Sequence, residues 1–193
     1  MSATLAFALL AIGWAVTRVI YQMQYRHTHR QLVLEKAAQR EQRVVWTVGI
    51  TVIPVSLVWL ATPWIDFAQM PWPIWTTVAG MATGVMALAL FVWTHRALRA
   101  NWSPVLQIRS GHELVTSGPY RWLAHPMYSA MTLGVVSNVC LTANYVLAVL
   151  QVAGLAILLV VRLRDEEKMM EYQFGGAYRQ FLETRWRLVP LIW

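Results

Sequence analysis

The chain has 193 residues, of which 58% are hydrophobic and 13% are charged, and its formal net charge is +7 at pH 7. This composition excludes an ordinary soluble domain and is typical of an integral membrane protein. The single cysteine, Cys140, lies in an apolar run, which excludes a disulfide framework and a cysteine-based metal site. The net charge alone leaves nucleic acid, acidic lipid and an anionic substrate open as partners.

Apolar stretches of membrane-crossing length predict an all-α membrane protein that forms a single domain over residues 1–193. Five transmembrane helices are predicted at residues 3–21, 44–65, 74–95, 127–141 and 144–162, followed by a tail over residues 163–193. The last two form a helical hairpin. The first is interpreted as a retained span, because no basic region precedes it and no small-residue cleavage site follows it.

Two features refine this arrangement. Residues 21–43 are polar, basic and free of glycine and proline, so a surface helix or helical extension is predicted there. In the third span, Gly80 and Gly84 have GxxxG spacing, which allows a close helix contact. Within a bundle of several spans, this pattern predicts packing inside the chain and not dimerisation.

Charge placement predicts the orientation. All 16 lysines and arginines, all five histidines and every acidic residue except Asp66 fall on one side of the predicted bundle or at its boundary. The excess of basic residues predicts that this side is cytoplasmic and that the N-terminus is outside. The basic residues are therefore interpreted as serving topology and contact with anionic headgroups, and they give no support to nucleic-acid binding.

Two polar segments on the cytoplasmic side are candidates for function. Residues 111–128 read GHELVTSGPYRWLAHPMY, and residues 162–178 read RLRDEEKMMEYQFGGAY. Turn-forming residues beside hydrogen-bonding side chains predict a cap over a pocket, made by the loop at residues 96–127 and the C-terminal tail. Arg162 and Glu166 are four residues apart and share one helix face. The alternative is an ordinary loop beside a salt-bridged juxtamembrane helix.

These motifs resemble the isoprenylcysteine carboxyl methyltransferase family, within the broader group of membrane phospholipid and isoprenylcysteine methyltransferases. The resemblance covers residues 101–190 and is carried by HELV, GPY, HPMY, EE and FGGAY in that order. It implies S-adenosylmethionine as cofactor. The family commonly has arginine before the His-Pro pair, whereas this chain has Ala124, and we hypothesise that Arg121 supplies the missing charge.

The resemblance also implies site residues. Arg162 orients the substrate, Glu166 reaches the ribose or the methionine end of the cofactor, and Leu114 with Val115 suits the adenine. The residues implied to bind the cofactor are Gln107, His112, Glu113, Leu114, Val115, Tyr120, His125, Pro126, Met127, Tyr128 and Glu166. Arg162 and Glu166 are the implied catalytic residues.

Methyl transfer from a sulfonium is a direct displacement, so alignment of the acceptor with the methyl group provides most of the catalysis. A carboxylate acceptor is already ionised at neutral pH and needs a cation to orient it, a role that Arg162 fits. An amine or thiol acceptor needs deprotonation, for which His125 or Glu166 is the candidate.

The leading hypothesis is carboxyl O-methylation of an S-prenylcysteine-type substrate that enters from the bilayer, with its tail near Gly80 and Gly84. The alternatives are phospholipid N-methylation, thiol S-methylation and, in another class, a non-catalytic membrane assembly or chaperone protein. The expected partners are a lipidic or prenylated small substrate and the lipid bilayer, without nucleic acid or an obligate protein partner. His27 and His29 are interpreted as loop residues, and no metal is expected.

Overall fold

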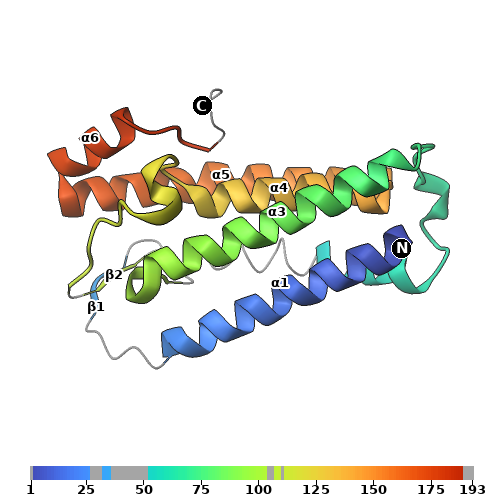
Figure 1. Ribbon diagram of the computed structural model, residues 1–193, viewed down its shortest axis with the longest axis horizontal. Helices are drawn as coiled ribbons and strands as arrows, with labels where there is room; N and C mark the ends of the chain where they lie inside the picture. The colour runs from blue at the N-terminus through green and yellow to red at the C-terminus, as the bar shows by residue number, and fades with distance from the viewer. Residues whose placement is uncertain (1, 27–31, 36–51, 104–106, 110, 189–193) are drawn as a thin grey trace.

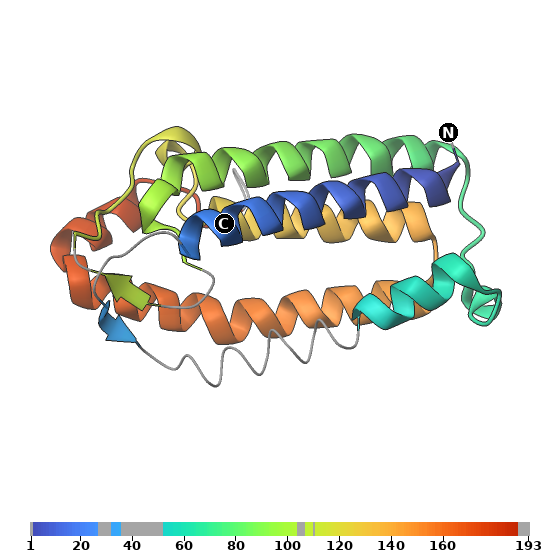
Figure 2. The same cartoon turned by 90° about the horizontal axis from the view of Figure 1, so that it is seen from below.

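The computed structural model describes residues 2–26, 32–35, 52–103, 107–109 and 111–188, and in it the long helices lie side by side in an elongated bundle (Figures 1 and 2). The α-helices are α1 (Ala3–Arg26), Val52–Ala61, α3 (Trp75–Leu98), α4 (Pro126–Thr142), α5 (Tyr145–Phe174) and α6 (Gly176–Glu183). The 3-10 helices are η1 (Asp66–Ala68), η2 (Arg99–Asn101) and η3 (Gly118–Arg121), and the strands are β1 (Leu32–Glu35) and β2 (Gln107–Arg109).

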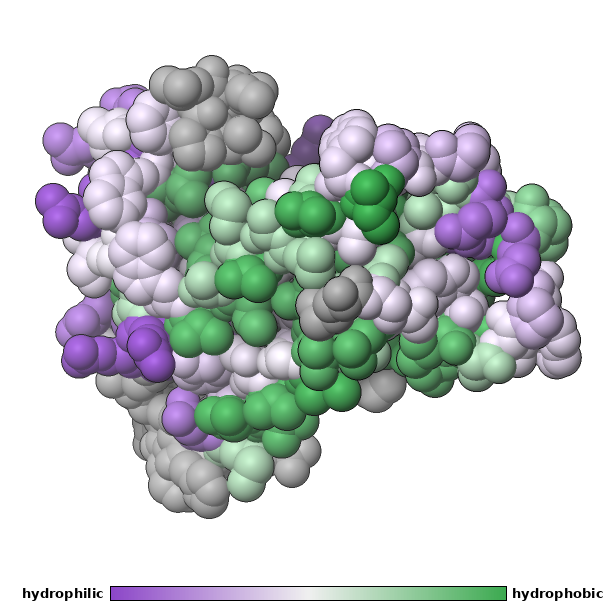
Figure 3. Space-filling model, turned by 45° about the vertical axis from the view of Figure 1, so that its right-hand side comes forward, coloured by the Kyte–Doolittle hydropathy of each residue, from purple (hydrophilic) through white to green (hydrophobic). Residues whose placement is uncertain are grey.

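Three of the described helices are long and apolar enough to cross a membrane: Ala3–Tyr25, Trp75–Leu98 and Tyr145–Phe174. Figure 3 shows apolar side chains gathered over the middle of the visible face, with hydrophilic residues mostly toward its ends. The chain is therefore an integral membrane protein. Each predicted span overlaps a described helix. Residues 44–51 of the second span lie outside the described residues, and α4 has 17 residues, so the five-span count stays a prediction.

The helix α5 continues past residue 162, where the last span is predicted to end, and the membrane boundary there stays a prediction. This helix has 30 residues and ends only at Gly175, whose φ is +54°; at about 1.5 Å per residue it is about 45 Å long. Residues 155–174 contain neither glycine nor proline, so nothing in the sequence interrupts the helix. The start of the predicted tail is thus a rigid continuation of the last apolar helix.

The predicted hairpin of α4 and α5 turns at Ala143 and Asn144, in contact with the connection before α3. The Asn144 side-chain oxygen accepts hydrogen bonds from the backbone N–H groups of Val146 and Leu147 and thereby caps α5. Its amide nitrogen donates to the Ile65 carbonyl at 2.8 Å. The two connections that the sequence assigns to the same side therefore lie together at one end of the bundle.

The faces of Gly80 and Gly84 are filled by neighbouring helices. A Cβ at Gly84 would lie 2.5 Å from the Ser137 hydroxyl, and one at Gly80 would lie 2.9 Å from Leu141. Ser137 also donates a hydrogen bond of 2.6 Å to the Gly80 carbonyl. The predicted packing within the chain is confirmed, and the predicted passage of a lipid tail along this face is wrong because α1 and α4 occupy it.

The fold is not purely helical, since β1 and β2 form a two-stranded antiparallel sheet. Leu32 lies opposite Arg109 and Glu35 opposite Gln107. A surface helix over residues 21–43 is therefore wrong at Leu32–Glu35, where pairing with a distant strand satisfies the backbone groups. The extension of α1 to Arg26 is as predicted. His27 and His29 lie outside the described residues.

Candidate functional site

One pocket lies where the polar end of α5 meets the insertion before α4, and α1, the end of α3 and α6 complete it. Its volume, counted out to the open mouth and including the solvent there, is about 990 Å³. Ten residues predicted from the sequence line it: His112, Glu113, Leu114, Val115, Tyr120, His125, Met127, Tyr128, Arg162 and Glu166. The structure thus brings together two segments that are about forty residues apart in the sequence.

Two predicted residues have other positions. Pro126 is fully buried at the start of α4, where its fixed φ suits the first turn of a helix, and it is not among the described residues that line the pocket. It can position the neighbouring His125 and Met127. Gln107 lies in β2 with its Cα opposite that of Glu35, and its side chain lies outside the described part of the structure.

The end of the chain holds the insertion in place through backbone pairing. The Ala124 N–H donates to the Trp186 carbonyl at 2.8 Å, and the His125 N–H donates to the Arg187 carbonyl at 3.0 Å. The Ser129 hydroxyl donates to the Leu188 carbonyl at 2.5 Å. The Arg185 guanidinium also donates to the Tyr120 carbonyl at 2.7 Å. The residues after α6 therefore order the segment that carries the His-Pro pair.

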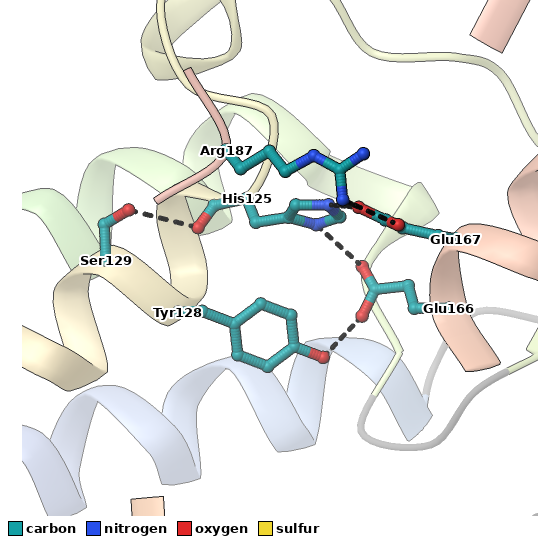
Figure 4. Close-up of polar contacts among 6 residues, drawn as sticks. All are labelled: His125, Tyr128, Ser129, Glu166, Glu167 and Arg187. Atoms are coloured by element: carbon teal, nitrogen blue, oxygen red, sulfur yellow. Dashed lines mark hydrogen bonds and ion pairs between the residues drawn. The ribbon is translucent and has the colours of Figure 1, made fainter. Parts of the chain in front are cut away.

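Two adjacent carboxylates on α5 have different environments (Figure 4). Glu167 is held by the His125 Nε2 at 3.1 Å and by the Arg187 guanidinium at 3.3 Å. Glu166 accepts a hydrogen bond of 2.5 Å from the Tyr128 hydroxyl and lines the pocket. Glu167 thus ties α5 to the insertion and the tail, whereas Glu166 is presented to the cavity.

The two ring nitrogens of His125 face the two carboxylates. A carboxylate can only accept a hydrogen bond, so the His125 Nε2 must carry a hydrogen in its contact with Glu167. In the neutral ring the lone pair is then on Nδ1, which lies 3.9 Å from a Glu166 oxygen. His125 is 4% exposed. The ring is therefore fixed in orientation, with Nε2 toward Glu167 and Nδ1 toward Glu166.

Cationic and anionic groups share the pocket. Arg162 and Glu166 both line it, as expected of residues one helical turn apart. Arg18 of α1 joins them, and its guanidinium lies 5.2 Å from the centre of the Trp102 ring. With Glu113, the site presents two guanidinium groups and two carboxylates, a set that can bind a zwitterion.

An aromatic wall closes the pocket on the side of α6. Tyr178 and Phe181 stack with ring centres 5.9 Å apart, and both pack against Ala124. Burial raises the pKa of the Tyr120 phenol well above its usual value, and nearby Glu166 and Tyr178 raise it further. Burial, Glu166 and Glu167 likewise raise the pKa of Tyr178. Both phenols are therefore neutral hydrogen-bond donors at physiological pH.

Residues 79–172 match the isoprenylcysteine carboxyl methyltransferase (ICMT) family. This match covers just under half of the chain and shows that the region is similar to that family. The chain is also 31% identical over 103 residues to the uncharacterized protein YpbQ of Bacillus subtilis. The aligned residues make up 53% of this chain and 60% of YpbQ. It is 23% identical over 142 residues to the nickel-cobalt-cadmium resistance protein NccN of Alcaligenes xylosoxydans xylosoxydans. These residues make up 73% of this chain and 61% of NccN. The chain thus spans about three fifths of the length of these two relatives.

Part of the pocket lies outside the residues that match this family. The matched residues include most of α3, the insertion, α4 and most of α5, whereas the pocket residue Arg18 precedes them and the pocket residues Tyr178 and Phe181 follow. Sequence reasoning did not assign these residues to the site. A charge next to an apolar span at Arg18 and the aromatic pair on one face of α6 were the available signals.

The limited space around Ala124 explains why a small residue occupies this position. Ala124 is 4% exposed and packed between the aromatic side chains of α6, so a long side chain would need their space. The hypothesis that Arg121 supplies the missing charge is not supported, because its guanidinium lies 5.6 Å from the Trp122 ring and it is not among the described pocket residues. Among the described residues, Arg187 places a positive charge near the His-Pro segment, because Glu167 contacts both Arg187 and His125.

Proposed function

We propose that the chain is an S-adenosylmethionine-dependent methyltransferase that acts on a lipidic acceptor, with carboxyl O-methylation of an S-prenylcysteine-type substrate as its reaction. The observation that carries the proposal is the convergence of two guanidinium groups, two carboxylates and an aromatic wall in one pocket of a chain that is similar to the ICMT family. This pocket lies at the polar end of apolar helices, where a water-soluble cofactor and a membrane-dissolved acceptor can meet.

The side chains of the pocket suit the chemistry of the cofactor. S-adenosylmethionine has an adenine ring, two ribose hydroxyls, an ammonium, a carboxylate and a sulfonium. Glu113 and Glu166 can accept hydrogen bonds from the ribose or the ammonium, and Leu114 with Val115 provides an apolar surface for the adenine. The faces of Tyr120 and Tyr178 can stabilise a sulfonium cation. When bound, the cofactor supplies an electrophilic methyl group.

The role of the chain is alignment. Arg162 lies one turn before Glu166 on the rigid part of α5 and can hold an acceptor carboxylate by two parallel hydrogen bonds. The carboxylate is ionised at neutral pH, so it needs no general base. Tyr128 orients Glu166, and the His125–Glu167–Arg187 cluster fixes the position of α5 relative to the insertion. Fixed geometry of this kind lowers the barrier of a direct displacement.

A methyl acceptor that needs deprotonation is the second candidate, in the form of a phospholipid amine or a thiol. The observation in its favour is the Nδ1 of His125, which holds the lone pair in the neutral ring and lies beside Glu166. These two groups can accept the proton that such a reaction releases. A non-catalytic role on the same scaffold is the alternative of another class.

We place the pocket and the C-terminus in the cytoplasm and the N-terminus outside. Arg96 and Arg99 at the end of α3 and Arg162 on α5 lie at the pocket end, as the basic bias of cytoplasmic segments requires. The proposed partners are the lipidic substrate and the bilayer, without nucleic acid or an obligate protein partner.

The test is methyl transfer by the purified protein in detergent from methyl-labelled S-adenosylmethionine. Acceptors are an S-prenylcysteine, phosphatidylethanolamine and a small thiol, each supplied separately. We expect label on the prenylcysteine as a base-labile methyl ester. Label that appears only on the amine or the thiol would replace the carboxyl reaction with the second candidate, and no cofactor binding together with no label would contradict both.

A further inference from the structure

A second cavity, distinct from the cofactor pocket, runs between the apolar helices. It is a groove bordered by α1, Val52–Ala61, α4 and α5, and its volume counted out to the open mouth is about 1730 Å³. Its walls are mainly apolar, with Phe7, Ile12, Leu57 and Leu155 among them. A groove of this composition within the apolar part of the bundle suits a hydrocarbon chain.

One side chain in this groove does not match its surroundings. Gln151 of α5 is 5% exposed and lines the groove, yet neither its amide nitrogen nor its amide oxygen has a hydrogen-bond partner among the described residues. The amide of Asn144, at the start of the same helix, is bonded through both its oxygen and its nitrogen. A buried amide without partners is costly, and more so among hydrocarbon groups.

The groove and the pocket are adjacent at one residue, because Met131 of α4 lines both. A single elongated molecule can therefore have its polar end beside Arg162 and its apolar chain in the groove. Gln151 is eleven residues before Arg162 on the same continuous helix, which places it about 16 Å away along the helix axis. The unpartnered amide thus lies at a defined distance from Arg162 along the apolar chain of the bound molecule.

We propose that the groove binds the apolar chain of the methyl acceptor, and that Gln151 recognises a hydroxyl group carried by that chain about 16 Å from the methylated end. A hydroxyl can accept a hydrogen bond from the amide nitrogen and donate one to the amide oxygen, so it satisfies both unpartnered atoms. This inference rests on the proposed function for the identity of the molecule. It specifies the substrate class further: an oxygenated chain is preferred over a pure hydrocarbon.

The experiment measures equilibrium binding of S-alkylcysteines of one length to the purified full chain, without cofactor. One compound has an unsubstituted chain, and the others have a single hydroxyl at successive carbons. We expect one narrow range of hydroxyl positions to bind about tenfold more tightly than the unsubstituted compound. In Gln151→Leu this preference should disappear, and the unsubstituted compound should bind at least as tightly as to the wild type.

Gln173→Leu is the matched control, because Gln173 is an exposed glutamine on the same helix and is not among the described groove residues. It should retain the wild-type preference. Gln151→Met is a second variant, and thermal unfolding confirms that each protein is folded. Equal affinity at all hydroxyl positions, or a preference that survives in both Gln151 variants, would overturn the inference.

The outcome is separable from that of the proposed function. Because binding is measured without S-adenosylmethionine and without turnover, a positional hydroxyl preference that Gln151→Leu removes would stand even if the chain transfers no methyl group. Conversely, methylation of a prenylcysteine with no such preference would leave the proposed function intact and remove the role of Gln151.

Discussion

The two ends of the bundle both contain polar clusters, but the clusters differ in what their side chains contact. At the end with the α4–α5 turn, the Asn144 amide is 0% exposed and bonds to the Ile65 carbonyl and to two backbone N–H groups of α5. At the other end, Glu166 and Arg162 line a cavity. The polar groups of the first cluster bond to other groups of the chain and stabilise the fold, whereas those of the second line a cavity that another molecule can fill.

The same contrast occurs within the pocket end, at adjacent residues. Glu167 is bound by His125 and Arg187, so it is part of the framework. Glu166 is oriented by Tyr128 and faces the cavity. Two glutamates of the same chain can therefore have a structural or a functional role, and the groups that each carboxylate contacts distinguish the two roles. Substitutions on the two sides should therefore divide between effects on stability and effects on ligands.

The largest effect is expected for Arg162→Ala. If Arg162 orients the acceptor carboxylate, its loss should lower methyl transfer by about a hundredfold, since a hydrogen-bonded charge is removed from the reacting complex. Affinity for S-adenosylmethionine should change little. Arg164→Ala is the control, because Arg164 is exposed on the same helix and is not among the described pocket residues. A loss of cofactor affinity equal to the loss of turnover would assign Arg162 to the cofactor.

Asn144→Ala should have the largest effect on stability. It removes the cap of α5 and leaves the Ile65 carbonyl without its donor, at a cost of about 2 kcal/mol in the free energy of unfolding. Turnover per folded molecule at low temperature should be unchanged. Thermal unfolding in detergent measures the loss of stability, and methyl transfer by the folded fraction measures turnover. Reduced turnover by fully folded protein would contradict the structural role of Asn144.

Glu166→Gln should weaken cofactor binding by about tenfold, because it removes the charge that an ammonium or ribose would contact. Glu167→Gln should instead lower stability, since it weakens the contacts to His125 and Arg187. Titration calorimetry and thermal unfolding on both variants separate the two roles. If the two substitutions have the same pattern, the proposed division between the adjacent acids is wrong.

The smallest effect concerns the buried phenols outside the spans. The folded-state pKa values of Tyr120 and Tyr178 are raised by burial and by nearby acids. Their contribution to stability is therefore complete below the unfolded tyrosine pKa of about 10 and is lost as pH rises above it. The unfolding temperature should fall more steeply above about pH 10 in the wild type than in Tyr178→Phe. Parallel curves would contradict the role of this phenol.

The sequence predicted the helices well where apolar length alone decides the outcome. Residues 74–95 match α3, and residues 144–162 match the apolar part of α5, because long apolar runs have few other structures in a membrane. The helix α5 continues beyond the predicted end of the last span, since hydropathy falls at Arg162 while helix propensity does not. The short sheet was not predicted, because pairing between Leu32–Glu35 and Gln107–Arg109 depends on contacts that neither segment encodes locally.

The pocket was predicted in part because its motifs are recognisable and polar. His125, Tyr128 and Glu166 stand out in a membrane protein, and the structure places them together. Arg18 and Phe181 have ordinary explanations as a helix-end charge and an apolar face, so only the fold reveals that they line the pocket. Gln151 was not distinguished either, because a single amide in an apolar run gives no indication of whether it has a partner.

Cofactor binding is measured by isothermal titration of S-adenosylmethionine into the detergent-purified chain. We expect saturable binding at one site per chain, weakened by Glu166→Gln and retained in Asn144→Ala below its unfolding temperature. The absence of binding heat at high cofactor concentration, with the protein shown to be folded and no competition by S-adenosylhomocysteine in a separate binding assay, would contradict this expectation.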